Sequence, residues 1–247
     1  MSKFFLRVGI LLPAVVLLFA VPVSAQEVSA ELQQVREVVS GRFAEINPEE
    51  IFESQIPGWY TIRKGAIVAY ISADGRYLLQ GDMIDLENNA NLTEESRNDA
   101  RVKMMSDVSN EQLIVYTPDK VEATVSIFTD IDCTFCRRLH AQLDEYMAEG
   151  IEIRYFLYPR NGPTSPSWAK AENVWCSDDR NEALTLAKLD QEYPTRNCDA
   201  SVVSSHYLIG QDVGLRGTPA IVLHDGSLFS GYLPPDQLKQ AIAAVGD

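Results

Sequence analysis

Two cysteines at the junction of a predicted strand and a predicted helix constrain this chain more than any other feature. Cys133 and Cys136 form a C-x-x-C motif within the segment FTDIDCTFCRRLH. The strand-like run VEATVSIFT precedes the motif at residues 121–129, and apolar residues spaced three or four apart follow it, as in an amphipathic helix. We therefore expect the cysteines in the first turn of a helix that starts directly after a strand.

This placement favours reactive sulfur chemistry. The first turn of a helix has unpaired backbone N–H groups and the positive end of the helix dipole, and both stabilise a thiolate at Cys133. Cys136 follows about one turn later and can close a disulfide with it. Arg137 and Arg138 add positive charge nearby, whereas the carboxylate of Asp132 opposes a second anion. We expect a redox pair in which Cys133 is exposed and attacks first, while Cys136 is covered by its own turn.

A zinc site and a purely structural disulfide are the alternatives for this motif. His140 extends it to C-x-x-C-x-x-x-H, but a structural zinc site needs four ligands and the sequence has no second C-x-x-C. We interpret His140 as an ordinary packed or solvated helix histidine, and we expect no metal and no organic cofactor. Redox chemistry is the preferred interpretation, because a C-x-x-C next to a strand–helix–strand pattern is typical of it.

The first 25 residues have the pattern of a cleaved export signal. Lys3 and Arg7 form a charged start, and the apolar stretch at residues 8–21 is shorter than the roughly 20 residues of a membrane helix. Val23-Ser24-Ala25 supplies small residues at the cleavage position, so we expect cleavage after Ala25.

The net charge of the chain is strongly negative. It is −14 before the signal and its two basic residues are removed. This charge argues against nucleic acid or anionic lipid as a partner. It is compatible with a protein of an oxidising compartment, where disulfides persist.

Residues 26–88 are expected to form a small N-terminal domain of one helix and an antiparallel sheet. The helix is predicted over residues 30–46, where Asn47-Pro48 ends it. Asp74-Gly75 is a hairpin signal between the last two strands. A unit of this size buries little core, so it would gain stability by pairing with a second copy, or alternatively by packing on the other domain. The predicted strands lie at residues 59–63, 66–72 and 77–84.

The rest of the chain is divided into a linker helix at residues 89–110 and an α/β domain at residues 111–247. The linker is rich in polar residues, so we expect a mostly exposed helix capped by Asn91 or Thr93. The cysteine-containing helix should end near Gly150. A βαβ unit followed by a helical insertion, a hairpin and a helix makes an α/β domain. The remaining predicted elements are strands at residues 112–117, 121–129, 151–158, 220–223 and 228–232, a helical insertion at 167–209 and a helix at 236–245.

Three segments give the chain a family resemblance. These are TDIDCTFCRRLH around the cysteines, GTPA at residues 217–220 and GYLPPDQLK at residues 231–239. With the order of the domains, they resemble the bacterial periplasmic disulfide isomerases, the family of DsbC and its relative DsbG. The resemblance covers nearly the whole mature chain. It implies a C-terminal thioredoxin-like domain with a helical insertion and an N-terminal dimerisation domain, in a periplasmic homodimer whose overall class is α+β.

The resemblance also implies roles for individual residues. Cys133 is the nucleophile and Cys136 the resolving cysteine. Pro219 matches the cis-proline of the family, and Thr218 lies against the active-site sulfurs. The dipeptide Thr134-Phe135 between the cysteines departs from the Gly-Tyr of DsbC. Because this dipeptide helps to set the redox potential, the potential of the pair stays open.

The other two cysteines lie in the helical insertion. Cys176 and Cys198 are 22 positions apart in a polar segment, and neither follows a strand at a helix start. We expect a structural disulfide between them, with a catalytic role as the alternative.

The implied reaction is thiol–disulfide exchange that rearranges wrong disulfides in misfolded secreted proteins. A membrane reductase of the DsbD type would keep the cysteine pair reduced. Two alternatives remain: a DsbG-like reductase of sulfenic acids on single cysteines, or chiefly a chaperone that holds unfolded chains in an apolar cleft.

Overall fold

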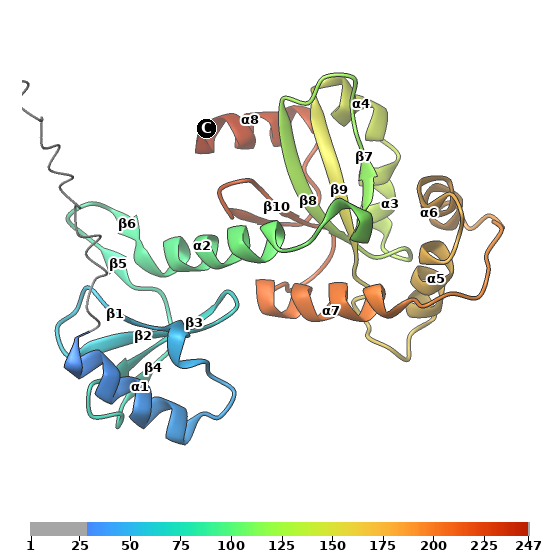
Figure 1. Cartoon of the computed structure of the whole chain (residues 1–247). Helices are drawn as coiled ribbons and strands as arrows, with labels where there is room; N and C mark the ends of the chain where they lie inside the picture. Colours follow the sequence, from blue (N-terminus) through green and yellow to red (C-terminus); the bar gives the residue numbers. More distant parts are fainter. Residues whose placement is uncertain (1–28, 247) are drawn as a thin grey trace, which may run out of the picture.

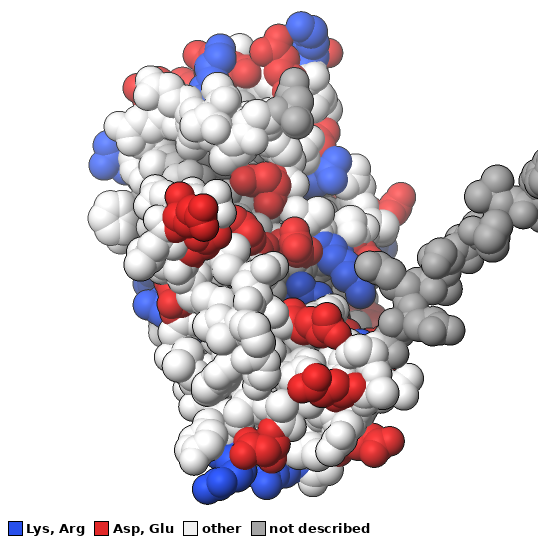
Figure 2. Space-filling view, turned by 90° about the vertical axis from the view of Figure 1, so that its left-hand side faces the viewer, with Lys and Arg blue, Asp and Glu red and all other residues white. Residues whose placement is uncertain are grey.

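The computed structural model describes residues 29–246, and within this range the chain forms two units connected by a helix (Figure 1). The expected export signal lies outside the described residues. None of the helices between residues 29 and 246 is both long and apolar enough to span a bilayer. Asp and Glu side chains are scattered over the face shown in Figure 2, among broad uncharged areas. This face agrees with the negative net charge of the chain.

The N-terminal unit is one helix packed on a four-stranded antiparallel sheet with the strand order β1-β2-β3-β4. Ser29 caps the helix by accepting a hydrogen bond from the backbone N–H of Leu32. Val35 and Val39 of the helix pack on buried residues of the sheet, among them Ile51 and Ile71. The elements are α1 (Ala30–Arg42), β1 (Ile51–Glu53), β2 (Trp59–Lys64), β3 (Ile67–Ser72) and β4 (Leu78–Leu79), with a 3₁₀ turn at Pro48–Glu50.

Two sequence predictions for this unit are wrong in extent. The helix ends at Arg42 and not at residue 46, because Phe43 leaves the helical region of backbone dihedral angles. The single strand predicted at residues 77–84 is divided, because Gly81 has a φ of +152° that extended strands do not adopt. The second part belongs to a separate two-stranded ladder of β5 (Ile84–Asp85) and β6 (Ala90–Asn91). Strand β1 was not predicted.

The connecting helix α2 (Leu92–Ser106) begins at its expected cap. The side chain of Asn91 accepts a hydrogen bond of 2.9 Å from the backbone N–H of Glu94. The prediction of a mostly exposed helix is wrong for one face, since Thr93, Ala100 and Arg101 are buried. The reason is tertiary: α2 packs against both units, and its charged residues contribute to those contacts.

Arg101 joins α2 to the C-terminal unit. Its guanidinium donates hydrogen bonds of 3.3 Å to the carbonyl oxygens of Val213 and Gly226, and only 4% of the residue is exposed. Gly226 has a φ of +85°, and a Cβ atom there would lie 2.1 Å from the carbonyl oxygen of Asn98. The N-terminal unit also touches the C-terminal one directly, where the backbone N–H of Ala66 donates a hydrogen bond of 2.7 Å to a carbonyl oxygen of α7.

The C-terminal unit is an α/β fold around a five-stranded sheet with the order β11-β10-β8-β9-β7. Strands β8 and β9 are parallel, and the other neighbours are antiparallel. The elements are β7 (Ile114–Tyr116), β8 (Ala123–Thr129), α3 (Thr134–His140), α4 (Leu143–Ala148), β9 (Ile151–Leu157), α5 (Pro166–Trp175), α6 (Arg180–Lys188), α7 (Ser201–Val213), β10 (Ala220–Val222), β11 (Leu228–Ser230) and α8 (Pro235–Val245), after a 3₁₀ turn at Asn110–Gln112.

Both faces of this sheet are covered. Ile127 and Tyr155 point to the larger core, which contains residues of α3 to α6 and α8. Phe128 and Phe156 point to the opposite face, where their rings stack at 4.6 Å and α7 covers them. Burial on both faces explains why the strand sequences are almost continuously apolar.

The helical insertion consists of α5, α6 and α7, with an irregular segment at residues 189–200 where the sequence predicted mostly helix. Cys176 at the end of α5 and Cys198 in the irregular segment are joined by a disulfide, with a Cα–Cα distance of 5.5 Å. The single helix expected after the first cysteine pair is two, α3 and α4, because the backbone of Gln142 leaves the helical region between them.

Candidate redox site

The first cysteine pair lies where β8 ends and α3 begins, as the sequence indicated. Cys133 is the N-cap residue of α3, with extended backbone angles, and Cys136 is in its first turn. Both are free thiols in the structure. The backbone N–H of Asp130, in the turn between the strand and the helix, lies 3.5 Å from the Sγ atom of Cys136. This turn therefore fixes the inner cysteine against the end of the sheet.

The segment with Thr218 and Pro219 lies against the outer cysteine. The peptide bond between these residues is cis, and the thiol of Cys133 donates to the carbonyl oxygen of Thr218 at 3.2 Å. The sheet explains this approach over 85 positions of sequence, because Ala220 is paired with Phe128 in neighbouring strands. The residues that the sequence suggested for the site are thus brought together.

The two thiols have opposite electrostatic environments. The pKa of Cys133 is lowered well below its ordinary value, first by a hydrogen bond from the side chain of Cys136. The side chain of Thr218, the backbone N–H of Cys136 and the positive charge of Arg160 act in the same direction. The pKa of Cys136 is raised, mainly by burial and then by the neighbouring sulfur. These opposite shifts favour a thiolate at Cys133 and a thiol at Cys136 in the reduced pair.

The prediction that Cys133 is exposed is wrong. Only 2% of the residue is accessible, and for Cys136 the value is 1%. The loop at Thr218 covers the outer sulfur, and this contact joins segments that no local sequence pattern connects. The two residues between the cysteines, Thr134 and Phe135, are exposed, and 56% of the phenylalanine is accessible.

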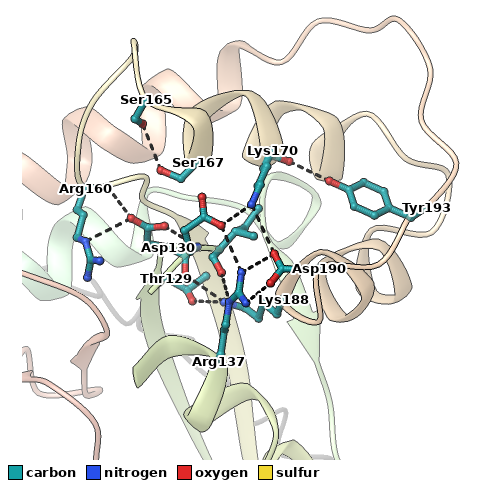
Figure 3. A network of polar contacts seen from close by, with 12 residues as sticks. Thr129, Asp130, Arg137, Arg160, Ser165, Ser167, Lys170, Lys188, Asp190 and Tyr193 are labelled. Carbon is teal, nitrogen blue, oxygen red and sulfur yellow. Dashed lines mark hydrogen bonds and ion pairs between the residues drawn. The ribbon is translucent and has the colours of Figure 1, made fainter. Parts of the chain in front are cut away.

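The charges next to the motif are arranged differently from the sequence interpretation. Arg137 donates to both carboxylate oxygens of Asp190, and it lies 3.3 Å from Asp132 (Figure 3). Lys170 of α5 lies 2.6 Å from the same Asp132 oxygen. The guanidinium of Arg138 lies over the ring of a tyrosine, 4.5 Å from its centroid. Carboxylates therefore compensate Arg137, and they also offset its effect on the thiolate.

Three charged residues of the site were missed. Asp130 is 2% exposed and accepts a hydrogen bond of 3.1 Å from the backbone N–H of Arg160, and its carboxylate also faces the guanidinium of that residue (Figure 3). Lys188 of α6 donates to the hydroxyl of Thr129 at 2.9 Å. The sequence does contain a signal for Asp130, because it is the second acidic residue, after Asp132, that closely precedes Cys133. The sequence around Arg160 and Lys188 gives no such signal.

His140 is a packed residue in the structure. Its ring nitrogens lie 2.9 Å from the hydroxyl of Thr185 and 3.3 Å from that of Tyr155. Burial and then the charge of Lys188 lower its pKa to about 3, so the ring is neutral. Between residues 29 and 246, no three His, Cys, Asp or Glu side chains gather as a potential metal site.

Comparison with known proteins identifies the family. Residues 24–94 match the disulfide bond isomerase protein N-terminal domain, and residues 109–246 match a thioredoxin-like domain. The thiol:disulfide interchange protein DsbC of Dickeya dadantii strain 3937 is 35% identical over 197 residues, which cover 79% of this chain and 80% of the relative. The chain belongs to the DsbC family. The DsbC of Escherichia coli strain K12 is 32% identical over 218 residues, or 87% and 88% of the two chains. That of Haemophilus influenzae strain Rd is 35% identical over 198 residues, or 78% and 82%.

Membership in the DsbC family confirms the fold and the class of reaction expected from the sequence. The C-terminal unit is the thioredoxin-like domain, and the N-terminal unit is the small domain that precedes it in the family. The chain is a thiol–disulfide oxidoreductase with disulfide isomerase activity.

Proposed function

We propose that Cys133 is the nucleophile of this activity and Cys136 the resolving cysteine. The observation that carries the assignment is their placement in α3: Cys133 is the N-cap residue and lies against Thr218, whereas Cys136 lies inside the first turn. The opposite displacement of their pKa values agrees with this placement. The thiolate is the attacking form, so the cysteine with the lowered pKa starts the reaction. Thr218 shapes the site through its hydrogen bonds, and the exposed Thr134 and Phe135 face the substrate.

The proposed cycle begins with attack of the Cys133 thiolate on a wrong disulfide of an exported protein. This attack forms a mixed disulfide and releases one substrate thiolate. Another substrate thiol can then attack the substrate sulfur of the mixed disulfide, which rearranges the pairing and restores Cys133. If none does, Cys136 attacks Cys133, and the enzyme is oxidised while the substrate is reduced. A membrane reductase of the DsbD type would then restore the dithiol, because the proposed compartment, the periplasm, is oxidising.

We also propose a homodimer formed through the N-terminal unit. Among residues 29–246, no strand pairs with the outer side of β4 in the four-stranded sheet, and its residues Leu78 and Leu79 are 49% and 48% exposed. An edge strand with exposed apolar side chains is a site for pairing with another chain. The proposed division is an export signal at 1–25, the dimerisation domain at 26–88, the linker helix at 89–110 and the catalytic domain at 111–247.

Refolding of a scrambled multi-disulfide protein tests these roles. Wild type should recover the native pairing, and Cys133→Ser should lose this activity entirely. Cys136→Ser should retain part of the rearrangement but accumulate mixed disulfides, because it lacks the resolving thiol. Undiminished isomerase activity in Cys133→Ser would refute the assignment. A variant that still suppresses aggregation without disulfide repair would reveal a separate chaperone activity.

A further inference from the structure

Lys188 is buried next to the cysteine pair, although thiol–disulfide exchange does not require a lysine. It is the last residue of α6, and 3% of it is exposed. Its Nζ atom donates to the hydroxyl of Thr129 at 2.9 Å and to the carbonyl oxygen of Asp130 at 3.4 Å (Figure 3). The backbone N–H of the same Asp130 lies 3.5 Å from the sulfur of Cys136. The ammonium group and the inner thiol thus contact the same residue of the turn.

This ammonium group has no carboxylate partner of its own. Its hydrogen bonds go to a hydroxyl and a carbonyl, and it takes part in none of the ion pairs found between residues 29 and 246. The carboxylate of Asp130 is instead bound by the backbone N–H groups of Asp132 and Arg160, and it pairs with the Arg160 guanidinium at 3.6 Å. Since an unpaired charge is costly in the protein interior, the protonated state of Lys188 depends on another anion.

The anions near Lys188 are the carboxylate of Asp130 and the cysteine pair. Tyr155 of β9, whose ring centroid is 6.0 Å from Nζ, stays protonated because burial raises its pKa. His140 of α3 is neutral, and Arg137 of α3 repels the ammonium group. Burial lowers the pKa of Lys188 to about 8, and the negative charges of the cysteine pair and of the Asp130 carboxylate oppose this shift. Within the reduced pair the charge is on Cys133, because burial keeps Cys136 a thiol. Of these anions, only the cysteine charge disappears when the pair is oxidised.

We propose that Lys188 is a redox-linked proton carrier of the cysteine pair, a cation when the pair is reduced and a neutral amine when the pair is a disulfide. The inference rests on the proposed roles of Cys133 and Cys136. Reduction by two electrons breaks the bond between their sulfurs. Cys133 becomes a thiolate, Cys136 takes up one proton and Lys188 takes up the second. Oxidation releases both protons. Lys188 is a positioning residue, because it acts on the sulfurs through its charge.

The number of protons taken up can be measured against glutathione. Oxidation of two glutathione thiols to one disulfide releases two protons. If the protein takes up both, the equilibrium constant for its reduction is nearly independent of pH over about one unit below pH 8. In Lys188→Met, which removes the charge and keeps an apolar chain, the protein takes up one proton. The equilibrium constant for reduction by glutathione should then rise about tenfold for each unit of increasing pH. This change equals a shift of about 30 mV in reduction potential relative to glutathione.

Lys170→Met is the matched control. This lysine also lies near Cys133, but it is 40% exposed and pairs with Asp132, so its removal should leave the wild-type dependence on pH unchanged. If the equilibrium constant of wild type itself rises tenfold per pH unit, the inference is overturned. It is also overturned if the constants of wild type and Lys188→Met depend equally on pH. If Lys188→Met does not fold, alkylation of wild type over the same pH range decides the matter. A flat dependence with Cys133 as a thiolate supports the inference, whereas a flat dependence with Cys133 as a thiol overturns it, because two thiols alone take up both protons. If Cys133 and Cys136 form no disulfide at any ratio of oxidised to reduced glutathione, the proposed function itself is refuted, and this inference is refuted with it.

Discussion

The carbonyl oxygen of Thr218 lies 3.2 Å from the sulfur of Cys133 and covers it, although the lowered pKa of this cysteine favours the reactive thiolate. Attack on a substrate disulfide therefore requires the loop at Thr218 to move away from the sulfur. The sulfur of Cys133 is thus both activated, because its pKa is lowered, and shielded, because the Thr218 carbonyl oxygen covers it.

Limited alkylation of the reduced protein should label Cys133 before Cys136. Because the pKa of Cys133 is lowered, its labelling rate should stay high as the pH falls well below 8.5, the ordinary value for cysteine. The rate should decline only when the pH falls through the folded-state pKa. Mass mapping at several pH values measures both sites. Preferential labelling of Cys136, whose pKa is raised by burial, would contradict the prediction.

Replacement of Arg101 should weaken the attachment of α2 to the catalytic domain. Arg101→Met leaves the carbonyl oxygens of Val213 and Gly226 without their donor, so we expect a loss of roughly 2–3 kcal/mol in the free energy of unfolding. Arg97→Met is the control, because this arginine pairs with carboxylates at the surface and should contribute less than about 1 kcal/mol. Urea denaturation of both variants gives the comparison. Equal losses would mean that the contact with the catalytic domain adds nothing.

A charge on the free edge of the N-terminal sheet should separate the proposed dimer. Leu79→Glu places a carboxylate on β4, where pairing with a second copy would bury it. The variant should be monomeric by light scattering, should still reduce an accessible model disulfide and should lose most of its isomerase activity, because two sites no longer face one substrate. Leu208→Glu, at a leucine of α7 that is 59% exposed, should change neither property. A monomeric wild type would refute the dimer.

Removal of the second disulfide should affect stability and leave the reactivity of the redox pair unchanged. The double variant Cys176→Ala and Cys198→Ala opens a loop of 22 residues, and we expect a loss of roughly 3 kcal/mol. The pH dependence of Cys133 alkylation should not change. A shifted profile would mean that this disulfide takes part in setting the site.

The sequence was most informative where structure depends on neighbouring residues. The strand before Cys133, the helix after it and the cap at Asn91 follow from local patterns, and the structure contains each of them. The failures involve contacts between distant segments. Arg101 is buried by residues more than 100 positions away, so a charged residue on a polar helix was taken for an exposed one.

Within the site, the same distinction holds. The motif indicated which sulfur lies at the helix start, and the family resemblance indicated which proline faces it. The covering of Cys133 depends on the pairing of β10 with β8, which no property of the motif specifies. Lys188 was missed because an isolated lysine near the end of an amphipathic helix is normally solvated, and only the packing of α6 against α3 buries it.

The contacts of Arg101 have a mechanical consequence for the redox site. Two of its four acceptors, Val213 and Gly226, lie on either side of the segment that contains Thr218, Pro219 and strand β10. One side chain of the connecting helix α2 therefore contacts the chain just before the loop that covers the reactive sulfur and again after the strand that follows this loop. A movement of α2 is therefore expected to shift the cover of Cys133 together with β10, so that the position of the N-terminal domain and the access to the reactive sulfur are coupled.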